Sequence, residues 1–362
     1  MLNDAANPPG PIEDTPLFAS CAVAVAFRAP SIQAPPILLG TSFNHLTARA
    51  LSISLVVSHF SEGMERWKVP ASLKLFDQVD CGALLVVSSF LVVLAWGCGS
   101  VVPDGPPEDM VRVEGGTYRL GSDSTEREFG YSGSPNVVRE YGWYDAWEAD
   151  PHEVELGPFA IDRTQVTQSD FAAFVTATGH QPPDVDSAAY HAQGFLVHPW
   201  SEVKPFRWVG GGPPDGLADH PVVLVDYADA ASYCAWRGER EGRATRLPTG
   251  PEWEAACRGQ ERRTYAWGAT WLDGAIVAET TFTAPVGFHP DGATPDGIHD
   301  LLGNIFEWTS SRMPPLESDE PVLRGCGWDD APGTCRCAFR HGRPAGSRHI
   351  LIGFRCAADL SR

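Results

Sequence analysis

The sequence is poor in positive charge. Only 27 of its 362 residues are Lys or Arg, against 46 Asp or Glu, so the formal net charge is −19 at pH 7. Polyanions repel a chain this acidic, which argues against general binding to DNA, RNA or anionic lipid headgroups. Apolar residues form 43% of the chain, enough for a sizeable core, so intrinsic disorder is not expected.

The sequence also lacks the motifs of several enzyme classes. No GxSxG, Walker or GxGxxG motif stands in a suitable context, and no internal repeat of 20 to 50 residues is present. One group of histidines is scattered without HxxxH spacing, which argues against a zinc site. These are His152, His180, His191, His198 and His220.

A long uncharged run is present, but the apolar stretch inside it is short for a membrane span. No charged residue occurs in residues 81–103, and the apolar run at 83–97 falls below the ~20 residues that a transmembrane helix needs. It fits the apolar region of a secretory signal, with Met64 and several basic residues upstream. We therefore predict a signal over residues 64–98, preceded by a gene-model extension or disordered segment at 1–63.

The end of this run resembles the lipobox of bacterial lipoproteins, in which the Cys becomes the lipidated first residue. Here that residue is Cys98, although Trp96 is bulkier than the pattern prefers. The resemblance implies a protein of the cell envelope or periplasm that touches the membrane only through its lipid. An uncleaved signal anchor, or a plain signal with an accidental Cys, are the alternatives. The small and Pro-rich residues 99–109 suit a tether.

The remaining residues, 110–362, predict one α+β domain. Residues 111–121 alternate around a Gly-Gly pair and predict a hairpin, while residues 153–162 predict a strand. The acidic and aromatic residues 122–152 show no period and predict an ordered loop. From residue 266 onward the Gly, Trp and Pro content predicts short strands joined by long loops.

Three helices are predicted from their first turns and apolar spacing. Thr167 with Asp170 approximates a capping box before residues 168–177, and Thr249 with Glu252 forms one before residues 253–257. Residues 226–238 carry apolar positions at helical spacing.

Five segments, in order, resemble the formylglycine-generating enzyme or sulfatase-modifying factor family. They are residues 113–118, 161–174, 246–259, 297–308, and 324–328 continuing to 353–359. The resemblance covers nearly the whole expected domain. It implies a variant of the C-type lectin fold with little regular secondary structure and long loops.

Six cysteines follow Cys98, an even number that is consistent with disulfides in an oxidising compartment. The family resemblance implies two pairs, Cys234 with Cys356 and Cys257 with Cys337. These bridges would close loops of about 120 and about 80 residues, worth roughly 4 to 5 kcal/mol each as an upper value.

The resembled enzymes bind Cu(I) between two cysteines that follow a GGSY-type motif. Residues 328–334, at the corresponding place, contain no Cys, and Gly327 stands where the motif has Ser. Cu(I) selects thiolates, and Asp oxygens cannot replace them, so copper is not expected. Cys326 and Cys335 leave three alternatives: a disulfide between neighbouring strands, unpaired buried thiols, or a relocated copper or redox pair.

The family resemblance also implies a structural calcium ion. Its ligands would be the carboxylates of Asp300 and Glu307 and the backbone carbonyls of Gly303 and Ile305, all oxygen donors that suit a hard cation. The alternative is a metal-free loop in which Asp300 caps a turn and Glu307 pairs with an Arg such as Arg355.

Two functions remain. The first is an exported, lipid-anchored family member without copper chemistry, which serves as a binding or scaffold module for a protein or peptide partner in the cell envelope. The second is an oxidoreductase that converts a protein Cys to formylglycine, or to a related product, through Cys326 and Cys335. The missing copper pair favours the first, and the variable loops of the family leave the partner unidentified.

Overall fold

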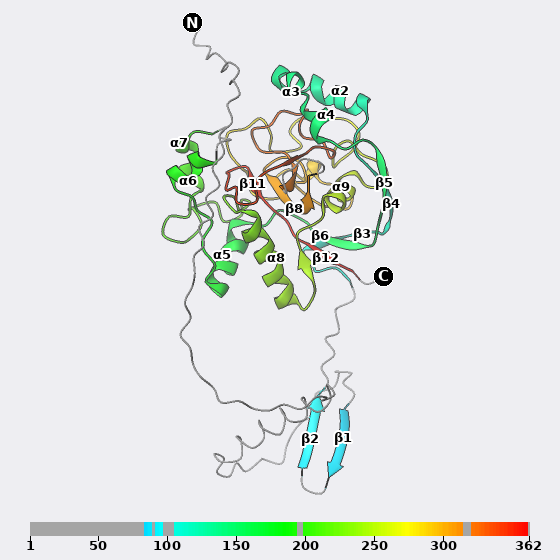
Figure 1. Ribbon diagram of the computed structural model, residues 1–362, viewed down its shortest axis with the longest axis vertical. Helices are drawn as coiled ribbons and strands as arrows, with labels where there is room; N and C mark the ends of the chain where they lie inside the picture. Colours follow the sequence, from blue (N-terminus) through cyan, green and yellow to red (C-terminus); the bar gives the residue numbers. More distant parts are fainter. Residues whose placement is uncertain (1–82, 89–90, 97–104, 194–197, 314–319, 361–362) are drawn as a thin grey trace, which may run out of the picture. The chain divides into compact units, whose positions relative to one another are not determined.

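The structure is a computed structural model that describes residues 83–88, 91–96, 105–193, 198–313 and 320–360 (Figure 1). Strands β1 (Ala83–Ser88) and β2 (Leu91–Trp96) pair antiparallel. The rest of the predicted signal, the extension at 1–63, the lipidation site Cys98 and most of the tether lie outside the described residues. No helix in the described ranges is long and apolar enough to cross a membrane.

One four-stranded sheet joins the beginning and the end of the domain. Strand β12 (Ala357–Asp359) lies between β6 (Phe159–Asp162) and β7 (Thr245–Arg246), and β3 (Met110–Val113) pairs with the other side of β6. All three pairings are antiparallel. Because the last strand sits inside the sheet, the last residues of the domain are needed to complete it.

A second four-stranded sheet crosses the core in the order β10-β9-β8-β11. Strands β8 (Phe306–Arg312) and β9 (Pro321–Gly325) are antiparallel, as are β9 and β10 (Arg340–Gly342), whereas β11 (Ile352–Gly353) runs parallel to β8. All five residues of β9 are buried, so the only charged residue in it, Arg324, must be paired inside the protein.

The predicted hairpin at residues 111–121 is wrong. Strand β3 pairs with β6, while β4 (Gly116–Leu120) pairs with β5 (His152–Leu156). At the Gly-Gly pair, a Cβ on Gly115 would lie 3.0 Å from Pro158, so the chain passes close to another segment instead of folding back. The single strand predicted at 153–162 is accordingly broken into β5 and β6 beside Pro158, which cannot donate to a strand ladder.

The ordered loop predicted at residues 122–152 is also wrong, because three short helices occupy it (Figure 1). They are α2 (Ser124–Ser132), α3 (Asn136–Glu140) and α4 (Trp143–Trp147). Tyr131 and Tyr144 pack together with ring centroids 4.7 Å apart. Tertiary packing of aromatic side chains, more than helical periodicity, fixes this segment.

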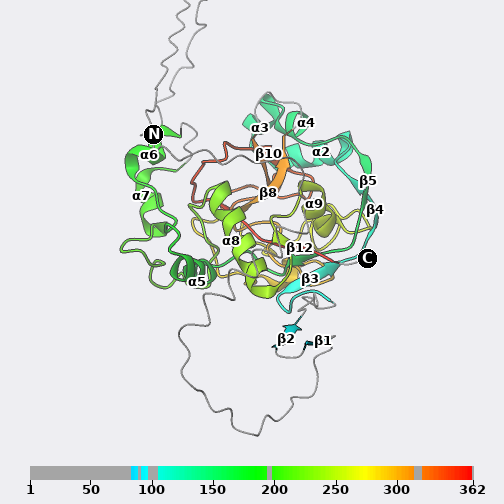
Figure 2. The same cartoon turned by 60° about the horizontal axis from the view of Figure 1, so that its bottom comes forward.

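The three predicted helices are present. They are α5 (Gln168–Thr178), α8 (Tyr227–Glu241) and α9 (Gly250–Arg258), and each begins with a capping box in which the N-cap side chain and the third helical residue exchange hydrogen bonds. Helices α5 and α8 lie side by side (Figures 1 and 2). The shorter elements are α6 (Ser187–Ala192), α7 (Trp200–Val203), η1 (Lys204–Phe206) and η2 (Pro290–Gly292).

Two disulfides attach the long helices to the sheets. Cys234 of α8 bonds Cys356 beside β12, and Cys257 of α9 bonds Cys337 shortly before β10. These are the pairs that the family resemblance implies. The helices and short strands form the α+β architecture expected from the sequence.

Candidate functional site

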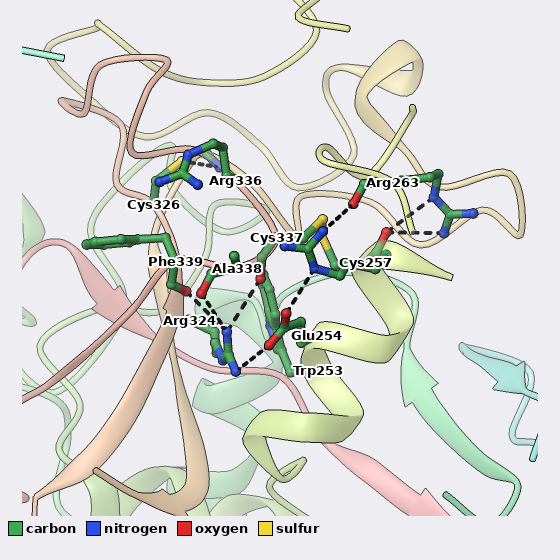
Figure 3. Close-up of a disulfide and its surroundings, with 12 residues drawn as sticks. Trp253, Glu254, Cys257, Arg263, Arg324, Cys326, Arg336, Cys337, Ala338 and Phe339 are labelled. Carbon is green, nitrogen blue, oxygen red and sulfur yellow. Dashed lines mark hydrogen bonds and ion pairs between the residues drawn. A yellow bond between two sulfur atoms is a disulfide. The ribbon is translucent and has the colours of Figure 1, made fainter. Parts of the chain in front are cut away.

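A buried charge network holds the segment between β9 and β10. Arg324 Nη2 donates to the carboxylate of Glu254 at 2.8 Å (Figure 3). Arg258 Nε donates to the same carboxylate at 2.9 Å. Burial alone would raise the pKa of Glu254, but the two guanidinium groups outweigh it and lower that pKa. Arg324 also donates to backbone carbonyls of residues 337–339, beside the Cys257 disulfide (Figure 3). The network therefore fixes the end of the segment that contains the third disulfide.

That third disulfide joins Cys326 to Cys335, whose Cα atoms lie 5.1 Å apart. Both residues are fully buried. The bond closes residues 326–335, which we call the disulfide loop, and this loop contains the positions where the resembled enzymes have their copper cysteines. Of the three alternatives left by the sequence, the structure contains the disulfide.

Two adjacent carboxyl groups lie in the disulfide loop. Gly327 N donates to Asp330 Oδ2 at 2.8 Å. Burial and the neighbouring Asp329 charge raise the pKa of Asp330 to about 7. A Cβ on residue 327 would lie 2.9 Å from Asp329 Oδ1, so the glycine allows the chain to approach these carboxyl groups closely.

His198, which precedes α7, binds the disulfide loop. Its Nε2 lies 3.0 Å from Asp329 Oδ2, and its Nδ1 lies 2.8 Å from Glu202 Oε2. Burial acts to lower the pKa of His198, but the hydrogen bonds to the two carboxylates outweigh it and raise that pKa. From the sequence alone, His198 is set aside because it has no HxxxH spacing, and its partner Asp329 is 131 residues away in the chain. The only local signal was Glu202, four residues after it.

Aromatic side chains surround His198 where it contacts Asp329. The His198 ring centroid lies 4.8 Å from Trp328 and 5.7 Å from His349, and Tyr190 stacks on His349. Burial lowers the pKa of His349 to about 3, so that ring is neutral near pH 7. We call these residues the His198 cluster: Tyr190, His198, Trp328, Asp329, Asp330 and His349.

Three buried atoms of the His198 cluster have no hydrogen-bond partner among the described residues. They are Tyr190 Oη, Trp328 Nε1 and Asp329 Oδ1. Buried polar atoms nearly always bond to protein, water or ligand. Their gathering beside the disulfide loop makes the His198 cluster the candidate binding position of the domain.

The predicted calcium residues lie in a second acidic loop, residues 300–307, which we call the Glu307 loop. Arg355 donates to both oxygens of the fully buried Glu307 carboxylate, at 2.7 and 2.8 Å, and Trp253 Nε1 donates to Oε2 at 2.7 Å. The carboxylate of Asp300 accepts Gly287 N at 2.6 Å, and burial raises the pKa of Asp300. The Gly303 carbonyl accepts the N–H of Ile305.

Three oxygens of this loop converge on Gln165, and two of them, those of Ile305 and Glu307, belong to the predicted set. Gln165 Nε2 lies 3.0 Å from the Asp300 carbonyl, 3.4 Å from the Ile305 carbonyl and 3.1 Å from Glu307 Oε1. Two carbonyls and a carboxylate are hard oxygen donors that suit calcium. The residues therefore fit the ion, with Asp300 contributing its backbone oxygen. Gln165 was not singled out from the sequence, although it lies in the matching segment 161–174.

Comparison with known proteins gives consistent results. The family model described as sulfatase-modifying factor enzyme 1-like domain matches residues 100–360. The inactive C-alpha-formylglycine-generating enzyme 2 of Mus musculus is 33% identical over 289 residues, covering 70% of this chain and 86% of that protein. The formylglycine-generating enzyme of Mycobacterium tuberculosis is 30% identical, covering 69% of this chain and 98% of that protein. The structure of PvdO from Pseudomonas aeruginosa superimposes with a TM-score of 0.54 at 25% identity, covering 69% of this chain and 94% of that one.

Proposed function

Because this chain belongs to the sulfatase-modifying factor enzyme 1-like domain family, we propose that it is a binding or scaffold module of that family without copper oxidase chemistry. The observation that carries the proposal is the disulfide between Cys326 and Cys335. Thiolates hold Cu(I), and a disulfide offers none. The other four cysteines in the described part of the chain are also paired, so this part supplies no thiolate pair.

Two further observations support the proposal. Gly327 stands where the resembled enzymes have the Ser of their GGSY-type motif, so a second position of that motif has changed. One relative at 33% identity is named an inactive formylglycine-generating enzyme, and the family fold therefore occurs in a protein without that activity.

The proposed place of action is the cell envelope, with attachment to the membrane through lipid on Cys98. Three disulfides support export, because such bonds are rare in the cytosol. The partner we propose is a protein or peptide with a basic segment. The net charge of −19 favours such a segment, and the partly exposed carboxylates of Glu202 and Asp329 lie at the edge of the His198 cluster.

We also propose that the Glu307 loop binds a structural calcium ion. The Glu307 carboxylate and the carbonyls of Asp300 and Ile305 would hold the ion, and the ion would supply a fixed positive charge at the start of β8. The role would be to stabilise the loop. Binding to the native state alone must raise stability as the free calcium concentration rises.

The test of the missing copper chemistry uses the oxidised full-length chain. We would add Cu(I), oxygen and a sulfatase-motif Cys peptide, and follow the peptide by mass spectrometry. We expect no tight Cu(I) binding and no conversion of the peptide. The matched control is Cys326→Ser, which frees Cys335 from its disulfide. Stoichiometric Cu(I) uptake that is lost in Cys326→Ser, together with oxygen consumption, would establish the oxidoreductase instead.

The anchoring is tested by Cys98→Ala in the bacterial host. We expect the variant to leave the membrane fraction or to accumulate unprocessed, because the thioether attachment site is gone. Fractionation and mass spectrometry of the N-terminal peptide provide the measurement. Unchanged membrane retention with an unmodified peptide would rule out lipid on Cys98.

A further inference from the structure

Gln165 has an unbalanced set of hydrogen-bond partners. The residue is buried, with 1% of its surface exposed, in the segment between β6 and α5. Its Nε2 faces three acceptors, although a side-chain amide carries only two hydrogens. Its Oε1 is buried and has no partner among the residues described. One end of the amide therefore has too many partners and the other has none.

The spacing around Nε2 matches a calcium coordination shell. Calcium binds six to eight oxygens at about 2.3 to 2.6 Å, so neighbouring ligands of one ion lie roughly 3 Å apart. The three oxygens facing Gln165 lie 3.0, 3.1 and 3.4 Å from Nε2. Oxygen and nitrogen of an amide exchange places on a half turn of its terminal torsion. With Oε1 inward, four oxygens would face one another, and only a cation would relieve their repulsion.

The hydrogen bonds of the Glu307 carboxylate show which donor must leave before a metal ion can bind there. Its Oε2 already accepts from Arg355 and Trp253, which uses both lone pairs. Its Oε1 accepts from Arg355 and from Gln165. Of these donors, Arg355 is fully buried and fixed by carbonyls of Asp162 and His299, so Gln165 is the donor that can leave.

We propose that Gln165 is a direct ligand of the calcium ion, with its amide nitrogen inward when the metal is absent and its amide oxygen inward when it is bound. The inference rests on the calcium site proposed above for the Glu307 loop. It adds a neutral ligand from a distant segment and explains the unpartnered Oε1 as half of a two-state amide. Because Arg355 offsets the Glu307 charge, the charge carried by residue 165 should set the calcium affinity.

Terbium luminescence and melting of the full-length chain test this role. Terbium occupies calcium sites, and Trp253, which donates to Glu307, would sensitise its emission. The variants are Gln165→Glu and Gln165→Met. The matched control is Gln168→Glu, a fully buried glutamine whose amide bonds Trp208 and the Pro221 carbonyl outside the loop.

In chelator we expect Gln165→Glu to melt well below the wild type, because a carboxylate then faces three oxygens. Calcium should restore it, with an affinity about tenfold above the wild type, while Gln165→Met should bind about tenfold more weakly. The control should lose stability in chelator yet bind calcium with the affinity of the wild type. In the 15N-labelled wild type, the carboxamide signal that is missing from Gln165→Glu should shift on calcium addition.

The outcomes separate the two proposals. If the wild type binds calcium, but residue 165 variants bind equally well and the carboxamide signal stays in place, Gln165 is not a ligand and the calcium site stands without it. If neither calcium nor terbium binds the wild type, the calcium site itself is absent and the role of Gln165 is overturned with it. Where Gln165→Glu does not fold, the signal that is missing from Gln165→Met identifies the same carboxamide in the wild type.

Discussion

The acidic side chains of the Glu307 loop are buried and those of the disulfide loop are partly buried, and the two loops also differ in the partners that these side chains have. Glu307 receives donors from Arg355, Trp253 and Gln165, which come from three separate parts of the chain. Asp330 receives one N–H from its own loop, and Asp329 Oδ1 has no partner in the residues described. In the first loop, protein donors satisfy the Glu307 carboxylate. The second retains an electrostatic cost that a bound molecule can relieve.

The comparison predicts that Glu307 tolerates substitution far less than Asp329. Glu307→Gln leaves the fully buried Arg355 without its counter-charge, and we expect a loss of about 3 to 5 kcal/mol in the free energy of unfolding. Asp329→Asn, at a partly exposed position, should cost about 1 kcal/mol or less. Denaturant unfolding of both variants provides the measurement, and equal losses would refute the difference between the loops.

Removal of the Cys326–Cys335 bond should have the next largest effect. The two cysteines are separated by nine positions in the sequence, for which chain entropy gives about 2 to 3 kcal/mol. We expect Cys326→Ala with Cys335→Ala to lose this amount and also to shift the His198 ring signals by NMR, because the loop positions Asp329. The control is Cys257→Ala with Cys337→Ala, which removes the bond that closes a longer loop. Unchanged His198 signals in the first variant would separate the disulfide from the cluster.

The elements predicted correctly from the sequence depend on neighbours in the chain. Thr167 and Asp170 are three residues apart, and so are Thr249 and Glu252, so their capping boxes are visible in any short window. The predicted hairpin failed for the opposite reason. The space beside Gly115 is filled by Pro158, and nothing within residues 111–121 indicates that contact.

The distance in sequence between partners also explains why one acidic loop was predicted and the other was not. The Glu307 loop lies in a segment that resembles the family, and its alternative partner Arg355 was anticipated from the sequence. The His198 cluster joins residues that are 131 positions apart, and no spacing pattern connects them. Two of its atoms, Trp328 Nε1 and Asp329 Oδ1, have no hydrogen-bond partner in the described part of the chain, and only the packing around them reveals this. The sequence therefore indicates the loop whose carboxylate is paired by the protein, and it does not indicate the cluster at Asp329.

Asp330 gives the disulfide loop a predicted pH dependence. Its pKa is about 7 in the folded chain against 3.8 in the unfolded one, so the native state binds the proton more tightly. Stability should therefore be greatest below about pH 4 for this group and fall as the pH rises toward 7. The shift alone corresponds to at most about 4 kcal/mol, and solvent at this partly exposed residue reduces it, so we expect about 2 kcal/mol.

Asp330→Asn tests whether Asp330 causes this pH dependence of stability, because it removes the charge and keeps an oxygen for the Gly327 N–H. The variant should have a flatter stability profile than the wild type between pH 4 and 8, and should be the more stable of the two at pH 8. Urea unfolding at several pH values provides the measurement. A wild-type decline that persists unchanged in Asp330→Asn would assign the effect to other groups.

His198 should give the smallest effect, with a distinct pH signature. Its pKa is raised in the folded chain, so its contribution is fully present below the unfolded value near 6.5 and is lost as the pH rises through the folded value. His198→Gln should therefore cost about 1 kcal/mol at pH 5.5 and less at pH 9. The control is His191→Gln, an exposed histidine of α6 that lies outside the cluster. A double-mutant cycle with Asp329→Asn isolates the pair, because only coupling between these two side chains survives the subtraction. Coupling that is absent at pH 5.5, or equal at both pH values, would show that His198 packs beside the disulfide loop without a charged bond to it.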